Sequence, residues 1–220
     1  MRPQFLHQKM SFLVGWLSIL SGFFIFNVSS VRAQIADVYL GAAATYTVFL
    51  NKGDIKIDKS LIVPQITGGI SIYLNSAQRL KINGEIAFAG RYFNTNLSNS
   101  TYEFRTLGFR FNTLVSYPIS EKLELEGGMG IYLYKMVLLE DDTFKRLGGQ
   151  SNIIDINVIA GTKYQLNNWL DAGVRASIGL IPMTKVYTVE KYGEMGRKKH
   201  LLNALTPEIY LRLKIYNRNR

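Results

Sequence analysis

Cysteine is absent from this chain of 220 residues. Its absence excludes disulfide bonds, thiol catalysis, cysteine metal sites and a lipid-modified N-terminal cysteine. Histidine occurs only twice, and charged residues make up 19% of the chain, below the roughly 25% that is usual in soluble domains. After residue 34 no apolar run reaches the ~20 residues that a membrane-spanning helix requires. Tyrosine (13), phenylalanine (12) and glycine (19) are plentiful instead.

The first 33 residues have the pattern of an export signal. Arg2 and Lys9 form a basic start, residues 10–28 are apolar, and Val31-Arg32-Ala33 is a small-residue cleavage site. We therefore predict a signal peptide over residues 1–33, cleaved before Gln34, although an uncleaved anchor would also explain a long apolar run. Because the signal contains three basic residues and no acids, cleavage lowers the formal charge from +10 to +7.

The rest of the chain, residues 34–220, is predicted to be a single domain of eight strands. Apolar and polar residues alternate with a period of two, which is typical of half-buried strands. In the first run, for example, Val38, Leu40, Ala42 and Ala44 share one face. The alternating runs are residues 38–50, 61–75, 80–93, 102–117, 123–138, 153–166, 169–182 and 204–216.

The connections between these runs alternate in length. Tight turns are expected at residues 76–79, 118–122 and 167–168, and long polar loops at 51–60, 94–101, 139–152 and 183–203. Prolines 64, 182 and 207 fall near the long-loop rim, and Pro118 lies in a short turn. Short turns on one rim and long loops on the other are typical of outer-membrane barrels, with the short turns in the periplasm.

The polar faces carry nearly balanced charges, which favours placing them inside the barrel. A low-dielectric interior requires such pairing, and the small residues between the charges suit a narrow lumen. With a three-residue turn at 166–168, Lys163 and Asp171 would face each other across a hairpin. A soluble lipocalin-like barrel, with its apolar face inward, is the alternative. The charged residues are Lys81, Arg91, Arg110, Lys163, Arg175, Arg212 and Lys214 against Glu85, Glu124, Glu126, Asp155, Asp171 and Glu208.

The outward faces end on aromatic residues. Tyr46 and Tyr92 are expected near the long-loop rim, and Tyr117 and Tyr164 near the short-turn rim. Aromatic residues at these depths form the interfacial girdles of membrane barrels.

From residue 37 to residue 216 the chain resembles the small eight-stranded outer-membrane barrels, the OmpA-, OmpX- and PorT-like families. The resemblance rests on the signal peptide, the eight alternating runs, the connection lengths and the closing segment Glu208–Tyr216. It implies an all-β, eight-stranded antiparallel up-and-down transmembrane barrel in the outer membrane, recognised by the assembly machinery through a terminal aromatic residue. Tyr216 takes that place, but residues 217–220 follow it, which is a departure from the family pattern.

No residues stand out as a catalytic, cofactor or metal site. His200, the one histidine outside the signal, lies in a basic segment without a carboxylate or serine spaced to orient it. Glu124 and Glu126 share a face but are surrounded by arginine-bearing runs, which favours a structural ion network over paired-carboxylate catalysis. The acids of residues 140–142 lack the ligand spacing of a calcium loop. We therefore expect no enzyme, cofactor or metal.

The expected partners are outer-membrane lipids, lipopolysaccharide and the outer-membrane assembly machinery, with no nucleic acid and a monomeric state. The basic segment 185–200 could contact lipopolysaccharide phosphates, or could simply favour solubility. A structural, surface-interaction or assembly-support role is favoured, because eight strands leave a lumen that side chains fill. A narrow solute channel and a lipid-directed enzyme that uses His200 are the other hypotheses.

Overall fold

The structure, a computed structural model, describes residues 34–50, 56–75, 80–97, 100–138, 150–151, 153–182, 184–189 and 197–217. The chain divides into two units, residues 1–34 and 35–220. The barrel described below lies within the second unit. The predicted signal peptide lies outside the described residues, and the predicted division at residue 34 stays a prediction. No helix in the described ranges is long and apolar enough to cross a membrane.

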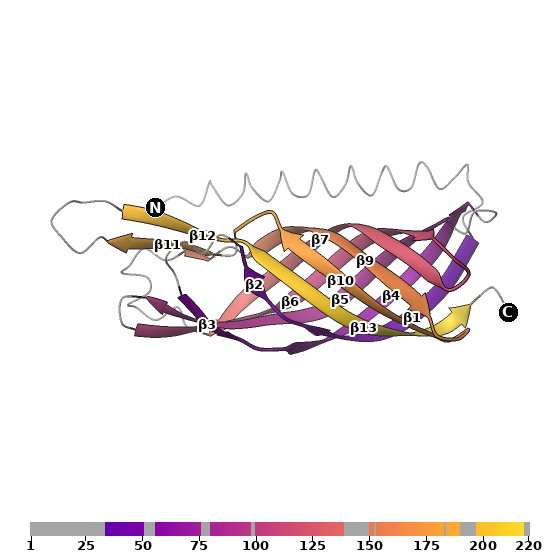
Figure 1. Ribbon diagram of the computed structural model, residues 1–220, viewed down its shortest axis with the longest axis horizontal. Helices are drawn as coiled ribbons and strands as arrows, with labels where there is room; N and C mark the ends of the chain where they lie inside the picture. Colours follow the sequence, from indigo (N-terminus) through magenta and orange to yellow (C-terminus); the bar gives the residue numbers. More distant parts are fainter. Residues whose placement is uncertain are drawn as a thin grey trace, which may run out of the picture. The chain divides into compact units, whose positions relative to one another are not determined.

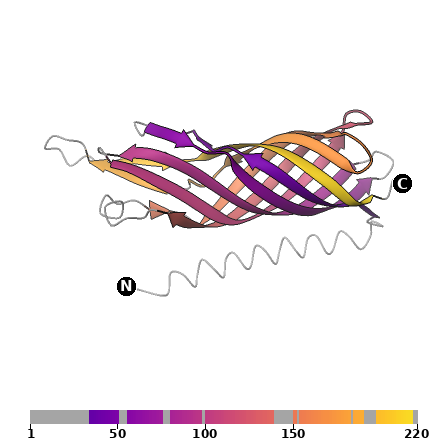
Figure 2. The same ribbon diagram turned by 90° about the horizontal axis from the view of Figure 1, so that it is seen from below.

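Eight strands close into an antiparallel barrel. Each strand pairs with the next one along the barrel, and the last pairs with the first, from Asp37 opposite Asn217 to Thr45 opposite Glu208. Figure 1 and Figure 2 show the strands winding around the barrel with a common tilt. The predicted fold class is therefore confirmed. The strands are β1 (Gln34–Thr45), β4 (Val63–Asn75), β5 (Leu80–Leu97), β6 (Ser100–Pro118), β7 (Leu123–Leu138), β9 (Ile154–Gln165), β10 (Leu170–Gly179) and β13 (Ala204–Asn217).

The long-loop side contains more strand than the sequence predicts. Strands β5 and β6 pair out to Leu97 opposite Ser100, so the expected loop at 94–101 is wrong. Polar residues continue a ladder wherever the partner strand continues, because backbone groups make the hydrogen bonds. The short strands are β2 (Val48–Phe49), β3 (Lys56–Ser60), β8 (Gln150–Ser151), β11 (Thr184–Val189) and β12 (Arg197–Leu202).

These short strands extend the barrel or form a second sheet. Strand β2 pairs with β13, and β3 pairs with the end of β5. Strands β8, β11 and β12 form a three-stranded sheet, so residues 184–189 and 197–202 of the loop expected at 183–203 are paired strands. The expected turn at residues 76–79 lies outside the described residues, whereas the turn at 118–122 is present between β6 and β7.

One proline lies deeper in the ladder than predicted. Pro207 sits inside β13, opposite Ala176 of β10, and not at the rim. On its other side, the Tyr46 amide donates a hydrogen bond to the Pro207 carbonyl at 3.1 Å. Proline has no amide hydrogen to return that bond. The ladder accordingly stops at Thr45 and resumes at Val48.

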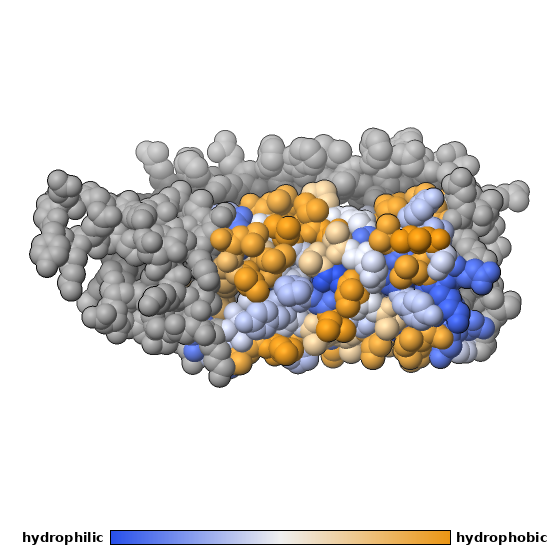
Figure 3. Space-filling view, viewed as in Figure 1, coloured by the Kyte–Doolittle hydropathy of each residue, from blue (hydrophilic) through white to orange (hydrophobic). Residues whose placement is uncertain are grey.

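The predicted outer faces are exposed and the predicted inner faces are buried. The exposed apolar residues include Leu40, Ile66, Phe109, Val174 and Leu213, one on each of five strands. Figure 3 shows hydrophobic side chains over the wall of the barrel, with a hydrophilic rim at the short-turn end. The soluble lipocalin-like alternative is therefore wrong, because that barrel would turn its apolar faces inward.

Three of the four tyrosines of the predicted girdles lie exposed on the outer wall. They are Tyr46, Tyr117 and Tyr164. Tyr92 has the outward parity but is only 9% exposed. The Arg105 guanidinium lies over its ring, 5.1 Å from the centroid. The prediction that Tyr92 is exposed on the outer wall is wrong, because Arg105 of the neighbouring strand covers its ring. The alternation of residues along one strand does not reveal contacts from a neighbouring strand.

Candidate functional site: the ionic interior of the barrel

Seven basic and seven acidic side chains point into the barrel within the described residues. Thirteen of them are those predicted from the polar faces. The additional one is Asp37, which is 3% exposed. It was missed because the first apolar run starts at Val38. Asp37 has the same parity as the buried, inward-facing Tyr39. Extending the first run by one residue would therefore have placed Asp37 on the inner face. With Asp37 the interior charges balance.

The centre of the lumen holds three arginines and three glutamates. Arg175 from β10 bridges two of the acids, with 2.6 Å from Nη1 to Glu85 Oε2 and 2.6 Å from Nη2 to Glu208 Oε1. Arg110 from β6 binds the other oxygen of Glu208 at 2.5 Å. Because each carboxylate accepts from more than one donor, the network offsets much of the desolvation cost of burying these charges.

Arg212 of β13 completes this central layer. Its guanidinium pairs with Glu85 and, at 2.6 Å, with Glu126. The Tyr39 and Tyr210 rings lie 4.9 and 4.3 Å from it, and cation–π contacts of this kind add attraction in a desolvated site. The same tyrosine hydroxyls donate to the acids, Tyr39 to Glu85 at 2.8 Å and Tyr210 to Glu126 at 2.6 Å. Arg212 is therefore fixed by two carboxylates and two aromatic rings.

A second layer, nearer the short turns, uses lysine as its only cation. Lys81 Nζ lies 3.4 Å from Asp37 Oδ2 and 3.0 Å from Glu124 Oε1. Lys163 Nζ lies 2.8 Å from the other oxygen of Glu124. Glu124 is the more exposed member, with its side chain 16% accessible. The flexible lysine stems suit this end of the lumen, because three rotatable donors reach acids on separate strands.

The pairing predicted for Lys163 and Asp171 is wrong in register. Asp171 stands opposite Gln165, and Lys163 stands opposite Gly173. The connection is longer than expected, since residues 166–169 form the turn. The two charges still approach to 4.0 Å on the diagonal, while Lys214 holds Asp171 at 2.9 Å.

Within the described residues, one ion pair lies above the central layer, toward the long loops. Arg91 Nη1 binds Asp155 Oδ2 at 3.0 Å, and Nη2 donates to Asn157 Oδ1 at 3.3 Å. The Tyr132 ring packs against the Arg91 guanidinium, 4.8 Å from centroid to Cζ. Ion pairs therefore occur at three levels of the lumen.

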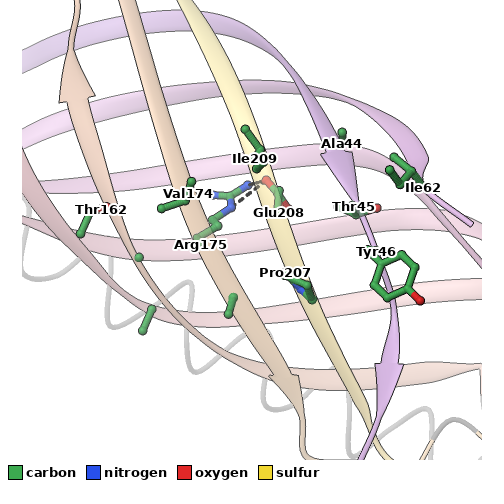
Figure 4. A pocket seen from close by; sticks show the side chains of 13 residues that line it. Ala44, Thr45, Tyr46, Ile62, Thr162, Val174, Arg175, Pro207, Glu208 and Ile209 are labelled. Carbon is green, nitrogen blue, oxygen red and sulfur yellow. Dashed lines mark hydrogen bonds and ion pairs between the residues drawn. The ribbon is translucent and has the colours of Figure 1, made fainter. Parts of the chain in front are cut away.

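An outer hollow lies beside the Arg175–Glu208 pair of the central layer. Figure 4 shows the Arg175–Glu208 ion pair joining β10 and β13, and an outer hollow bordered by Tyr46, Val174 and Pro207. The hollow has a volume of about 620 Å³ and is floored by small residues such as Ala44 and Ala176. It lies on the apolar outer wall and brings no reactive groups together.

The residues weighed for chemistry are dispersed. Glu124 and Glu126 do share the interior, where Lys163 lies near both and Arg212 binds Glu126, as expected for a structural network. His200 pairs through its backbone with Val186 in the β11–β12 hairpin. Residues 140–142 lie outside the described residues. Among the part of the chain that is described, no three histidine or acidic side chains are grouped to hold a metal.

Comparison with known proteins gives similarity in solved structures only. No protein-family profile and no curated protein sequence matches the chain. The neisserial surface protein A structure has 13% identity and a TM-score of 0.48, and covers 83% of this chain and 99% of its own. OprG from Pseudomonas aeruginosa has 15% identity and a TM-score of 0.43, covering 84% and 99%. Ail of Yersinia pestis has 12% identity and a TM-score of 0.45, covering 81% and 97%. At these values the likeness concerns architecture alone.

Proposed function

We propose that this chain is a non-enzymatic outer-membrane barrel whose interior is a structural ion network and whose lumen does not conduct. Its role is to contribute to envelope integrity, to surface contact or to assembly support. The observation that carries the proposal is the central layer, where Glu85 binds both Arg175 and Arg212 across the lumen and all three residues are between 2 and 5% exposed.

The outer wall supports the membrane location. Apolar side chains such as Ile86, Phe111 and Leu211 are about half exposed on strand after strand. A soluble protein rarely exposes contiguous apolar surface of this extent. In a bilayer the same surface faces acyl chains, and the closed ladder leaves no unpaired edge.

The charged interior supports a closed lumen. A diffusion pore needs a continuous water path, whereas an eight-stranded barrel is just wide enough for side chains to fill. Here ion pairs cross the lumen between strands that are not neighbours, such as Glu85 of β5 with Arg212 of β13. A solute would have to separate these buried pairs, which is costly because each leaves an uncompensated charge.

The proposed partners are outer-membrane lipids and the outer-membrane assembly machinery. The first strand begins and the last strand ends at the short-turn rim, where Asp37 stands opposite Asn217. We assign this rim to the periplasm, as is usual for such barrels. The basic residues of segment 185–200 remain the proposed contact with lipopolysaccharide, and the barrel is proposed to act as a monomer.

Two measurements test the proposal. Membrane fractionation, with detergent gels of unheated and heated samples, should place the protein in the outer-membrane fraction with a band that shifts on heating. Planar-bilayer recording of the purified barrel should show no single-channel steps. A soluble protein without heat modifiability would refute the membrane assignment. Reproducible conductance steps would replace the structural role with the narrow-channel hypothesis.

A further inference from the structure

The lumen above the central layer contains polar atoms without hydrogen-bond partners. Gln65 Oε1, Ser177 Oγ and Thr206 Oγ1 are buried and unpaired. Their residues are only 2 to 3% exposed. Buried polar groups in folded proteins are nearly always satisfied, by protein or by ordered water. These three atoms therefore require partners that the protein itself does not supply.

The three residues belong to one section of the wall. Ser177 of β10 stands directly opposite Thr206 of β13, and Gln65 lies on β4. Strand β1 lies between β13 and β4 in the barrel order. The neighbouring inward residues on β5 are Ala87 and Ala89, which are too short to reach across. Polar walls with short side chains leave room for water.

The central ion layer lies below this section. Arg175 precedes Ser177 by two residues, and Glu208 follows Thr206 by two, so the Arg175–Glu208 pair is the next inward level on the same two strands. Both charged side chains are buried. The section is thus bounded toward the short turns by the ion layer that fills the lumen.

A phenylalanine cluster lies above it. Phe49 stands opposite Ala204, which is two residues beyond Thr206 toward the long-loop side. Its ring lies 4.4 Å from that of Phe93, and Phe93 stacks on Phe104 at 4.7 Å. All three are at most 3% exposed. Polar molecules and ions lose hydrogen-bond partners when they pass apolar aromatic side chains, so this cluster is the candidate upper boundary of the section.

We propose that this section, bounded by Phe49, Phe93 and Phe104 above and by Arg175 and Glu208 below, is a closed chamber. Water is its resident occupant, and its chemistry suits small uncharged molecules that both donate and accept hydrogen bonds. The Arg91–Asp155 ion pair lies on the inward level next below Phe93 and adds no net charge to the section. Two hydroxyls and one amide oxygen supply the unpaired binding groups. The aromatic cluster controls entry from the long-loop side. This inference goes beyond the closed-barrel role and does not depend on it.

The absence of cysteine allows a direct test. In the folded barrel, Ser177→Cys places one thiol in the chamber and loses no hydrogen bond there. Ser116→Cys is the matched control, because Ser116 is fully buried and bonds to the Glu126 side of the ion layer. The probe is methyl methanethiosulfonate, a small uncharged thiol reagent. Each thiol is measured alone and combined with Phe93→Ala.

Modification of Ser177→Cys should be slow alone and at least about tenfold faster with Phe93→Ala, because a buried thiol reacts in proportion to its open population. Ser116→Cys should react slowly in both backgrounds. If Phe93→Ala left the Ser177→Cys rate unchanged, the phenylalanines would not control entry to the chamber. If Phe93→Ala accelerated Ser116→Cys equally, the ion layer would not be the lower boundary of the chamber. Phe93→Leu replaces Phe93→Ala if the latter lacks the heat-shifted band of a folded barrel.

Hydration is tested separately in the unsubstituted barrel. Water-to-amide magnetisation transfer, measured by NMR in detergent micelles, should give long-lived water contacts at Ser177 and Thr206. Leu114, an inward apolar residue that is fully buried, is the control and should give none. Absence of water contacts at Ser177 and Thr206 would show a dry, collapsed section and overturn the chamber.

Discussion

Replacing Arg212 with leucine should strongly destabilise the barrel. The substitution removes the guanidinium that pairs with Glu85 and Glu126 and that lies between the Tyr39 and Tyr210 rings. Glu85 keeps Arg175 at 2.6 Å, so it stays compensated. Glu126 keeps only the Tyr210 hydroxyl at 2.6 Å, a long bond from Ser116 at 3.4 Å and Lys163 at 4.0 Å.

The expected loss follows from that uncompensated carboxylate. Removing one partner of a buried ion pair typically costs about 3–5 kcal/mol, and we expect Arg212→Leu to fall in this range. Adding Glu126→Gln should recover part of the loss, because the residual charge is then gone. The exposed turn residue Lys122 is the control, and Lys122→Met should change stability by less than about 0.5 kcal/mol.

The measurement is urea unfolding of the barrel in lipid vesicles, followed by tryptophan fluorescence. Without residues 1–33 the chain contains one tryptophan, Trp169, at the β9–β10 turn, which makes the signal simple to interpret. A loss for Arg212→Leu no larger than that for Lys122→Met would refute the reasoning. The reasoning would also be refuted if Arg212→Leu combined with Glu126→Gln were less stable than Arg212→Leu alone by a further amount of about 3–5 kcal/mol.

Two further predictions concern the wall. Val174→Arg places a charge on the exposed apolar surface at mid-barrel and should cost about 2–4 kcal/mol in vesicle unfolding, whereas Ile119→Lys in the exposed turn should be nearly neutral; equal effects would argue against a bilayer around Val174. Gly108→Ala should lower the unfolding midpoint, because its methyl group would overlap the Leu133 carbonyl of the neighbouring strand. Gly84→Ala meets nothing within 4 Å and should be neutral or slightly stabilising in the same assay. Similar midpoints for the two alanine variants would contradict the close strand approach at Gly108.

Much of the fold could be predicted, because alternation is a local property of the chain. The apolar parity of residues such as Leu40 and Phe109 identified the strands, their outer faces and thirteen of the inward charges. Strand ends were less predictable. Residues 94–101 gave no alternating hydrophobic signal, yet residues 94–97 and 100–101 pair across β5 and β6.

The detailed site could not be predicted, because its contacts are between residues far apart in the chain. Glu85 and Arg212 are 127 positions apart. Their meeting depends on the strand order and the stagger with which the barrel closes. Gln165 pairs with Asp171, so five residues separate the paired strands where three were expected, and Lys163 moved from opposite Asp171 to a diagonal contact. Unpaired atoms such as Ser177 Oγ are likewise visible only once all neighbours are placed.

The sequence by itself therefore determined the strands, their two faces and the near-balance of charge, since these follow from the order of residues along each strand. Only the tertiary structure decided which charges pair, that Asp37 completes the balance, and that Phe49, Phe93 and Phe104 come into contact. The physical reason is that the period of two fixes the direction of a side chain. Its height in the barrel and its partner across the lumen are set by closure of all eight strands.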